Sequence, residues 1–333
     1  MFAKGRRAPF SQGNGAFMSV LYWFESIRTP FLTTLMDLVT RLGEETIIVV
    51  LALLFLWCLD KYEGYYLLTV GFAGMLASQF LKILCRVPRP WVKDPSFTIV
   101  ESAREEATGY SFPSGHSQNA VGAFGSVAAW QKQKVVRILA ILFCVLVPVS
   151  RMYLGVHTPA DVLVGSGISL VFLFAFLPLF RTLKEHPRRF YILLGSFFLL
   201  SLAYVFYLEL GSFPSETADE LANLLSAKEN AYKLIGSLLG LTVMYLLDHK
   251  LWKYETRAPW LAQILKLILG AVVVMGVKIL LKSPLLALTG GHASAGAIRY
   301  FLMFAVGGAC PGLFPYITRF SLFIMQKCKR TKA

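Results

Sequence analysis

The chain has 333 residues, of which 56% are hydrophobic, and its mean hydropathy is +0.59. This composition excludes an ordinary soluble domain, because several apolar runs are long enough to cross a bilayer core of about 30 Å as helices. The net charge of +14 does not indicate a nucleic-acid partner, since the basic residues mostly flank apolar runs and no basic-aromatic module occurs. We therefore predict an all-α, polytopic membrane helix bundle.

The first predicted element, residues 15–42, mixes apolar with charged residues. This mixture is typical of an amphipathic interfacial helix rather than a span, and it defines an N-terminal region over 1–43. Nine spans are then predicted, at about 45–59, 64–84, 117–131, 135–150, 159–180, 190–209, 231–247, 260–281 and 299–318.

The charges of the loops predict the orientation. In a nine-span topology, the basic segments after the third, fifth and seventh spans and at the C-terminus share one side, and the acidic loop 210–230 lies on the other. An excess of Lys and Arg marks the cytoplasmic side. The basic tail over residues 1–7 is the one misfit, and it would fit if residues 15–42 crossed the membrane.

Three polar clusters interrupt the apolar pattern, all on the predicted outer side. They are Lys82-x6-Arg89-Pro90, Pro113-Ser114-Gly115-His116 and Ser150-Arg151-x5-His157-x3-Asp161. Charged groups at a membrane are costly, so their convergence indicates a functional site.

The first property of these clusters is affinity for an anion. Lys82, Arg89 and Arg151 have no obvious acidic partners, and guanidinium groups match phosphate oxygens. Ser114 and Gly115 begin a helix, where free N–H groups bind anions. Taken alone, Ser114 is also typical of a helix N-cap, and Lys82 and Arg151 of side chains that snorkel to the interface.

The second property is acid-base and nucleophilic chemistry. Of the two histidines, one can attack phosphorus and the other can protonate a leaving oxygen. Asp161 lies four residues after His157 and can fix its tautomer, although Thr158-Pro159-Ala160-Asp161 is equally a capped helix start. No carboxylate pair or Cys/His cluster suggests a metal, and the five cysteines are scattered, so neither metal nor cofactor is expected.

Together the clusters resemble the three-part signature of the type 2 phosphatidic acid phosphatase superfamily, with every position matched in order. The resemblance covers about residues 45–180 and implies a six-helix phosphatase core, which we place at 44–210. It also implies a metal-independent lipid phosphatase. His157 would form a phosphohistidine, Asp161 would orient it and His116 would protonate the leaving group. Implied phosphate ligands are Lys82, Arg89, Ser114, Gly115 and Arg151.

The resemblance leaves the substrate open. In a bacterial plasma membrane with the site on the extracytoplasmic face, undecaprenyl diphosphate is the first candidate. Phosphatidylglycerol phosphate, phosphatidic acid and sphingoid-base phosphates are alternatives. Two further hypotheses are a protein that binds or transports a phospholipid without hydrolysis, and a transferase that uses the same intermediate.

Residues 211–333 add C-terminal spans that echo the core. The stretch 277–286 (VKILLKSPLL) is similar to 81–90 (LKILCRVPRP), and 290–301 (GGHASAGAIRYF) is similar to 114–124 (SGHSQNAVGAF). A degenerate repeat is one interpretation, and chance similarity between apolar helices is the other. The copy lacks a second Ser-Arg-x5-His-x3-Asp, so no second active site is expected. Lys278, Lys282 and His292 are predicted to approach a substrate headgroup.

Overall fold

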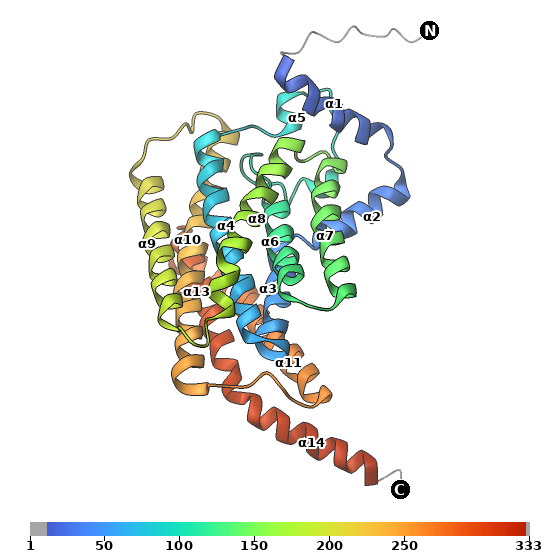
Figure 1. The fold of residues 1–333 in the computed structure, drawn as a ribbon. Helices are drawn as coiled ribbons and strands as arrows, with labels where there is room; N and C mark the ends of the chain where they lie inside the picture. The colour runs from blue at the N-terminus through green and yellow to red at the C-terminus, as the bar shows by residue number, and fades with distance from the viewer. Residues whose placement is uncertain (1–11, 331–333) are drawn as a thin grey trace.

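The structure is a computed structural model that describes residues 12–330, so the basic tail over 1–7 lies outside the described residues. Within this part of the chain there are fourteen α-helices and no strand, which confirms the all-α prediction (Figure 1). The helices are α1 (Gln12–Ser26), α2 (Pro30–Arg41), α3 (Glu45–Leu54), α4 (Lys61–Cys85), α5 (Pro90–Lys93), α6 (Gly115–Trp130), α7 (Lys134–Tyr153), α8 (Pro159–Arg181), α9 (Arg188–Leu210), α10 (Ala218–Leu246), α11 (Trp260–Leu280), α12 (Lys282–Leu288), α13 (Ser294–Ala309) and α14 (Phe314–Arg330). Short π-helical segments, Phe55–Leu59 and Leu247–Trp252, extend α3 and α10.

Seven helical segments in the described part of the chain are long and apolar enough to cross a membrane, against nine predicted. An eighth arises if Pro30–Arg41 and Glu45–Leu59, which meet at a bend of 54°, form one broken span. The prediction at 117–131 corresponds to α6, which has only 16 residues. At 1.5 Å per residue α6 is about 24 Å long, shorter than the bilayer core.

The N-terminal region forms two helices where one was predicted. Thr29 and Pro30 separate them, because a residue before proline disfavours the α conformation. The Thr29 side chain accepts a hydrogen bond from the Leu32 N–H at 3.3 Å, and Pro30 occupies the first turn of α2, where a missing N–H costs nothing. The helix α2 packs on α7 and so reaches the polar clusters.

At the centre of the molecule α6 packs against α4, α7 and α8. Small residues allow this close approach. A Cβ at Gly74 of α4 would lie 2.2 Å from the Gln118 side chain, and one at Gly165 of α8 would lie 2.5 Å from the Ser114 carbonyl oxygen. These contacts fix the position of the start of α6 relative to α4 and α8.

The C-terminal helices pack on the core through α10, which contacts α4 and α9, and through α11, which contacts α3. The order of elements resembles that of the core: a π-extended helix, a second helix, a short helix and a 16-residue helix. The packing differs, since α10 lies along α13, whereas α3 contacts α6 only briefly. The repeat therefore stays a prediction.

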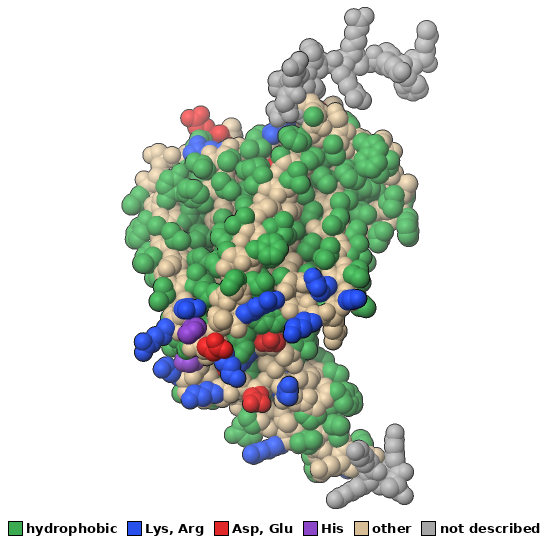
Figure 2. Space-filling view, viewed as in Figure 1, with side chains coloured by type: hydrophobic (Ala, Val, Ile, Leu, Met, Phe, Trp, Pro, Cys, Tyr) green, Lys and Arg blue, Asp and Glu red, His purple; other side chains and the backbone are tan. Residues whose placement is uncertain are grey.

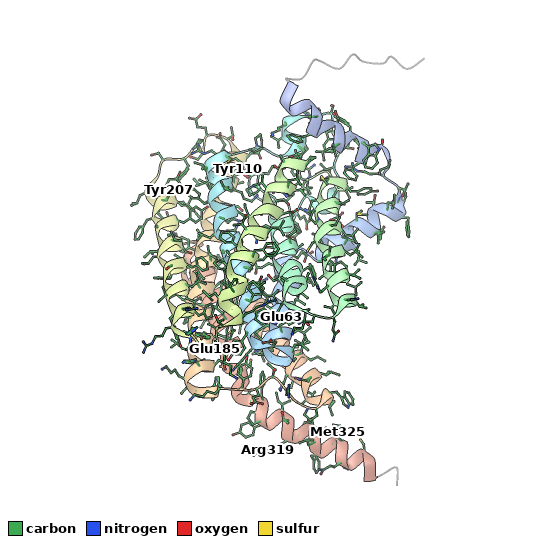
Figure 3. The ribbon with its side chains drawn as sticks, in the orientation of Figure 1. Glu63, Tyr110, Glu185, Tyr207, Arg319 and Met325 are labelled. Carbon is green, nitrogen blue, oxygen red and sulfur yellow. The ribbon has the colours of Figure 1, made fainter. Side chains whose placement is uncertain are left out.

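The two ends of the bundle differ in charge. Figure 2 shows a broad hydrophobic belt with Lys and Arg gathered in a band below it. Tyr110, beside the polar clusters, lies toward one end, and Glu185, in the basic connection between α8 and α9, lies toward the other (Figure 3). The clusters and the basic loops thus occupy opposite ends, as the topology predicted.

Candidate active site

The three clusters come together around one cavity of about 180 Å³ at the end of the bundle opposite the basic loops. Five of the eight predicted site residues line it, namely Lys82, Arg89, Gly115, His116 and His157. The other three, Ser114, Arg151 and Asp161, are fully buried beside it. Ligand pockets typically measure about 300–1,000 Å³, so this cavity has room for a headgroup and not for a lipid chain.

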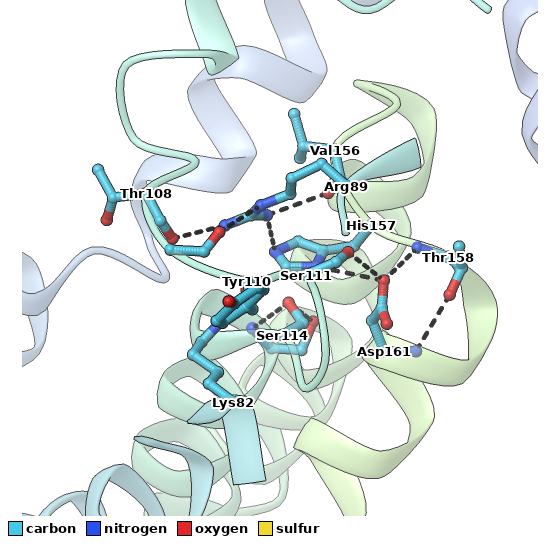
Figure 4. A network of polar contacts seen from close by, with 12 residues as sticks. Lys82, Arg89, Thr108, Tyr110, Ser111, Ser114, Val156, His157, Thr158 and Asp161 are labelled. Atoms are coloured by element: carbon cyan, nitrogen blue, oxygen red, sulfur yellow. Dashed lines mark hydrogen bonds and ion pairs between the residues drawn. The ribbon is translucent and has the colours of Figure 1, made fainter. Parts of the chain in front are cut away.

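Arg89 is the centre of the hydrogen-bond network (Figure 4). Its Nε donates to the Gly109 carbonyl at 3.1 Å and its NH2 to the Thr108 carbonyl at 2.7 Å. Its NH1 donates to the Val156 carbonyl at 3.1 Å and lies 3.0 Å from Nε2 of His157. All three nitrogens of the guanidinium are therefore held in place, as recognition of a phosphate requires.

His157 lies between a cation and an anion. Because Arg89 donates to Nε2, that nitrogen carries the lone pair and Nδ1 carries the proton. Nδ1 lies 3.5 Å from Oδ2 of Asp161. Burial and the charge of Arg89 lower the pKa of His157, with Asp161 opposing them. The ring is therefore neutral, with the Nε2 lone pair directed at the guanidinium.

Asp161 has both of the roles that its sequence context left open, since it caps a helix and also faces His157. Its Oδ2 accepts hydrogen bonds from the Ser111 hydroxyl at 2.6 Å and from the Thr158 N–H at 2.8 Å. The second bond completes a capping box at the start of α8. The same oxygen faces His157, so capping α8 also places the carboxylate beside the imidazole.

The start of α6 presents backbone donors to the cavity. Gly115 and His116 are its first two residues, and N–H groups at these positions have no partner within the helix. A Cβ built on Gly115 would meet no atom within 4 Å, so this side of Gly115 faces open space. Ser114 is the N-cap: its hydroxyl oxygen accepts from the Ser117 N–H at 3.4 Å and from the Ser117 hydroxyl at 2.9 Å.

The remaining cations are buried, which is contrary to snorkelling. Lys82 donates from Nζ to the Tyr110 carbonyl oxygen. Arg151 is 1% exposed and donates from NH1 to the Thr40 hydroxyl at 2.9 Å. Its Nε and NH2, like Nε2 of His116, have no hydrogen-bond partner among the described residues. Such orphaned donors are costly when buried, and an oxyanion would satisfy them.

Several residues at the site were not predicted. Thr40 and Ser111 support Arg151 and Asp161, and no sequence signal marked Thr40, although Ser111 lies in the same short stretch as Ser114. Further unpredicted residues line the cavity, among them Glu44, Glu45, Glu106, Asn223, Ser226 and Asn230.

The three C-terminal residues that were predicted to approach a substrate headgroup lie in different places. Lys278 reaches Glu45 at 3.1 Å and thus contacts the cavity wall. Lys282 lines a separate cavity of about 220 Å³, and His292 stacks edge-on with Tyr232. Within residues 12–330 no group of three or more His, Cys, Asp or Glu side chains is placed to hold a metal ion.

Two known protein families match separate segments of the chain. Residues 62–185 match the PAP2 superfamily, and residues 232–319 match a second family described as "PAP2 superfamily phosphatase, transmembrane extension". No solved structure is significantly similar.

Three curated relatives are similar to part of the chain. A phosphatidylglycerophosphatase B of Bacillus subtilis is 31% identical over 177 residues, covering 49% of this chain and 81% of the relative. A sphingosine-1-phosphate phosphatase 1 of Rattus norvegicus is 27% identical, covering 42% of this chain and 33% of the relative. An undecaprenyl-diphosphatase of Bacillus subtilis is 26% identical, covering 38% of this chain and 64% of the relative.

Proposed function

The chain belongs to the PAP2 superfamily of lipid phosphatases, and from this premise we propose that it hydrolyses lipid phosphate or diphosphate esters through a phosphohistidine at His157. The observation that carries the proposal is the position of His157, whose Nε2 lone pair faces the Arg89 guanidinium inside the cavity. A bound phosphoryl group would lie between them, where the cation stabilises the charge that develops in the transition state.

Each step has a residue to perform it. Nε2 of His157 attacks phosphorus while the bond to the ester oxygen breaks, and His116 donates a proton to that oxygen. Negative charge from the substrate favours the protonated form of His116. Water then attacks the phosphohistidine, His116 accepts the water proton, and the N–P bond breaks to release phosphate. Asp161 holds the Nδ1–H tautomer throughout.

The phosphate oxygens have a defined set of donors. Lys82, Arg89 and the backbone of Gly115 line the cavity directly. Ser114 positions the start of α6 as its N-cap, and Arg151 brings buried charge with two unpartnered nitrogens. We propose that these five residues neutralise the transferred group and that catalysis requires no metal.

Membership of the family does not by itself identify the substrate, for which there are several candidates. From topology alone, undecaprenyl diphosphate is the first candidate for a site on the outer face of a plasma membrane, and an undecaprenyl-diphosphatase is among the relatives. Phosphatidylglycerol phosphate and sphingoid-base phosphates are supported by two other relatives, and phosphatidic acid by the family signature. The outward orientation is supported by the Lys and Arg band at the opposite end of the bundle (Figure 2).

The proposed domain boundaries agree with the two family matches. We propose a phosphatase core over 44–210 and an extension over 211–333, and the two family matches fall inside these bounds. The N-terminal region over 1–43 lies against the core through α2, with residues 1–11 outside the described part.

Phosphate release in detergent, with EDTA present, tests the proposal. The substrates are a panel of lipid mono- and diphosphates, and the proteins are the wild type, His157→Ala and the exposed control His292→Ala. We expect EDTA-resistant release that is lost in His157→Ala and retained in His292→Ala. Release from no lipid by a folded wild type would contradict hydrolysis and favour lipid binding or transport. Phosphate found on a second lipid would indicate a transferase.

A further inference from the structure

The C-terminal extension forms one wall of the catalytic cavity. Four α10 residues line it, namely Asn223, Ser226, Ala227 and Asn230. Their spacing of three and four residues places them on one face of the helix. This face packs on the core through Ala227, which belongs to a buried cluster with Ile83 and Tyr110.

The same face contacts the loop that holds Arg89. Gly109, whose carbonyl accepts from Arg89, has a φ of 70°, and a Cβ there would lie 3.6 Å from the Ser226 hydroxyl. The Tyr110 hydroxyl interacts with Asn223, while the Tyr110 carbonyl accepts from Lys82. The Asn230 amide makes no hydrogen bond to another described residue, so its polar atoms are available to a ligand.

The cavity is cationic only at its phosphate-binding end. Lys82 and Arg89 are its only Lys or Arg lining residues in the described chain, and three glutamates also line it. Glu45 is neutralised by Lys278 at 3.1 Å, and it accepts a hydrogen bond from the Tyr300 hydroxyl at 2.6 Å.

The other two glutamates have no direct ion pair among the described residues, and the buried cation that interacts with both is Arg151. No salt bridge within 4.0 Å joins Glu44 or Glu106 to another described residue. Glu44 follows Gly43, where a Cβ would lie 2.9 Å from the His116 carbonyl oxygen. Glu44 and the proposed acid, His116, line the same cavity.

We propose that α10 and these carboxylates select a lipid phosphate monoester whose alcohol carries a hydrogen-bond donor near the ester oxygen, and that they select against a diphosphate. This inference rests on the proposed hydrolysis at the same cavity. A second phosphate would lie among carboxylates with no further cation among the described residues lining the cavity, since Arg151 is buried beside it, and this is unfavourable in a partly dry cavity. A hydroxyl or ammonium group would instead donate to the Asn223 and Asn230 carbonyl oxygens or to Glu44.

Two matched substrate pairs test the inference. Farnesyl phosphate and farnesyl diphosphate differ by one phosphate, and lysophosphatidic acid and phosphatidic acid differ by a free 2-hydroxyl. The wild type should prefer the first member of each pair in kcat/KM, by on the order of 10-fold for the charged pair. Asn223→Ala/Asn230→Ala should lower kcat/KM for lysophosphatidic acid by about 3- to 10-fold and change phosphatidic acid little.

The charge component is tested separately. Glu44→Gln/Glu106→Gln should raise the ratio of diphosphate to monophosphate turnover on the order of 5-fold. Glu229→Gln is the matched control, because Glu229 lies on α10 outside the catalytic cavity. Glu229→Gln should leave unchanged both the ratio of diphosphate to monophosphate turnover and the ratio of lysophosphatidic acid to phosphatidic acid turnover.

The outcomes separate this inference from the proposed function. If the wild type releases phosphate from no lipid, both fail. If release depends on His157 but the diphosphate is the better farnesyl substrate, only the selectivity inference fails. It fails equally if the variants of α10 and of the glutamates leave both ratios at the wild-type value.

Discussion

NH1 of Arg89 lies 3.0 Å from Nε2 of His157 and donates to its lone pair. The guanidinium thus occupies the direction from which phosphorus must approach. Its other nitrogens are held by carbonyl oxygens of the loop at 108–109, so the cation stays in place when a ligand separates it from the ring. The contact between Arg89 and His157 therefore holds both groups in position, and a phosphoryl group would replace it by a stronger interaction with the guanidinium.

Arg89→Lys should lower kcat/KM by on the order of 100-fold although it keeps the charge, because a single ammonium cannot bind the loop carbonyls and a phosphate together. Steady-state kinetics on the best lipid substrate measure this. Arg104→Lys is the control, since Arg104 lies in the same loop but is exposed and pairs with Glu101. Near wild-type kcat/KM in Arg89→Lys would contradict the need for a guanidinium group at this position.

The pH profile of kcat/KM reports the protonation of His157. Burial and Arg89 lower its pKa, so the ring stays neutral and nucleophilic below its ordinary value of about 6.5. Activity should therefore fall only as pH drops well below that value, where the ring gains a proton. Arg89→Gln removes a repelling cation and should move this acidic limb to higher pH.

Asp161→Asn should move the same limb in the opposite direction. Asp161 raises the pKa of His157, so its neutralisation lets the pKa fall further. The variant should also lose about 10³-fold in kcat, because Nδ1–H loses its anionic partner. Ser111→Ala, which removes one donor to Oδ2, is the milder control. Limbs that coincide in all four proteins would show that His157 does not set the profile.

The convergence of the three clusters was predictable because each lies where a predicted span begins or ends on the same side of the membrane. Capping chemistry explains part of this success. Ser114 and Asp161 each cap a helix, so the local signals that end the spans also place the site residues. The burial of Arg151 against Thr40 was not predictable, because it depends on α2 packing across α7.

The wall formed by α10 was also missed, for a similar reason. Asn223 and Asn230 are ordinary polar residues in the first half of α10, and only tertiary packing brings them to a cavity formed more than 60 residues earlier in the chain. The nine predicted spans exceed the seven long apolar helices of the described residues because they include the 16-residue α6 and residues 45–59, which belong to a bent helix pair. The small residues that make α6 apolar serve its contacts with neighbouring helices.

Gly165→Ala tests the contact between α8 and the start of α6. Its new Cβ would lie 2.5 Å from the Ser114 carbonyl, so the two helices must separate. We expect a loss of about 1–3 kcal/mol in the free energy of unfolding and a lower kcat, since Gly115 and His116 move with Ser114. Thermal unfolding in detergent and phosphate release measure the two effects. Gly167→Ala, with no atom within 4 Å of its Cβ, should change neither. Equal effects of the two substitutions would contradict the steric argument.

The orientation of the site determines which leaflet supplies the substrate, and cysteine labelling tests it. Cys85 and Cys328 are exposed and are first replaced by serine. Ser212→Cys then places a thiol in the connection between α9 and α10, and Lys184→Cys places one in the basic connection between α8 and α9; both positions are exposed.

An impermeant maleimide should label Ser212→Cys on intact cells and Lys184→Cys only after lysis, because Lys and Arg are retained on the cytoplasmic side. The site lies at the same end as residue 212, so this pattern would give it access to lipids of the outer leaflet. The reverse pattern would overturn the orientation. It would also remove the topological reason for considering undecaprenyl diphosphate, while leaving the chemistry of His157 unaffected.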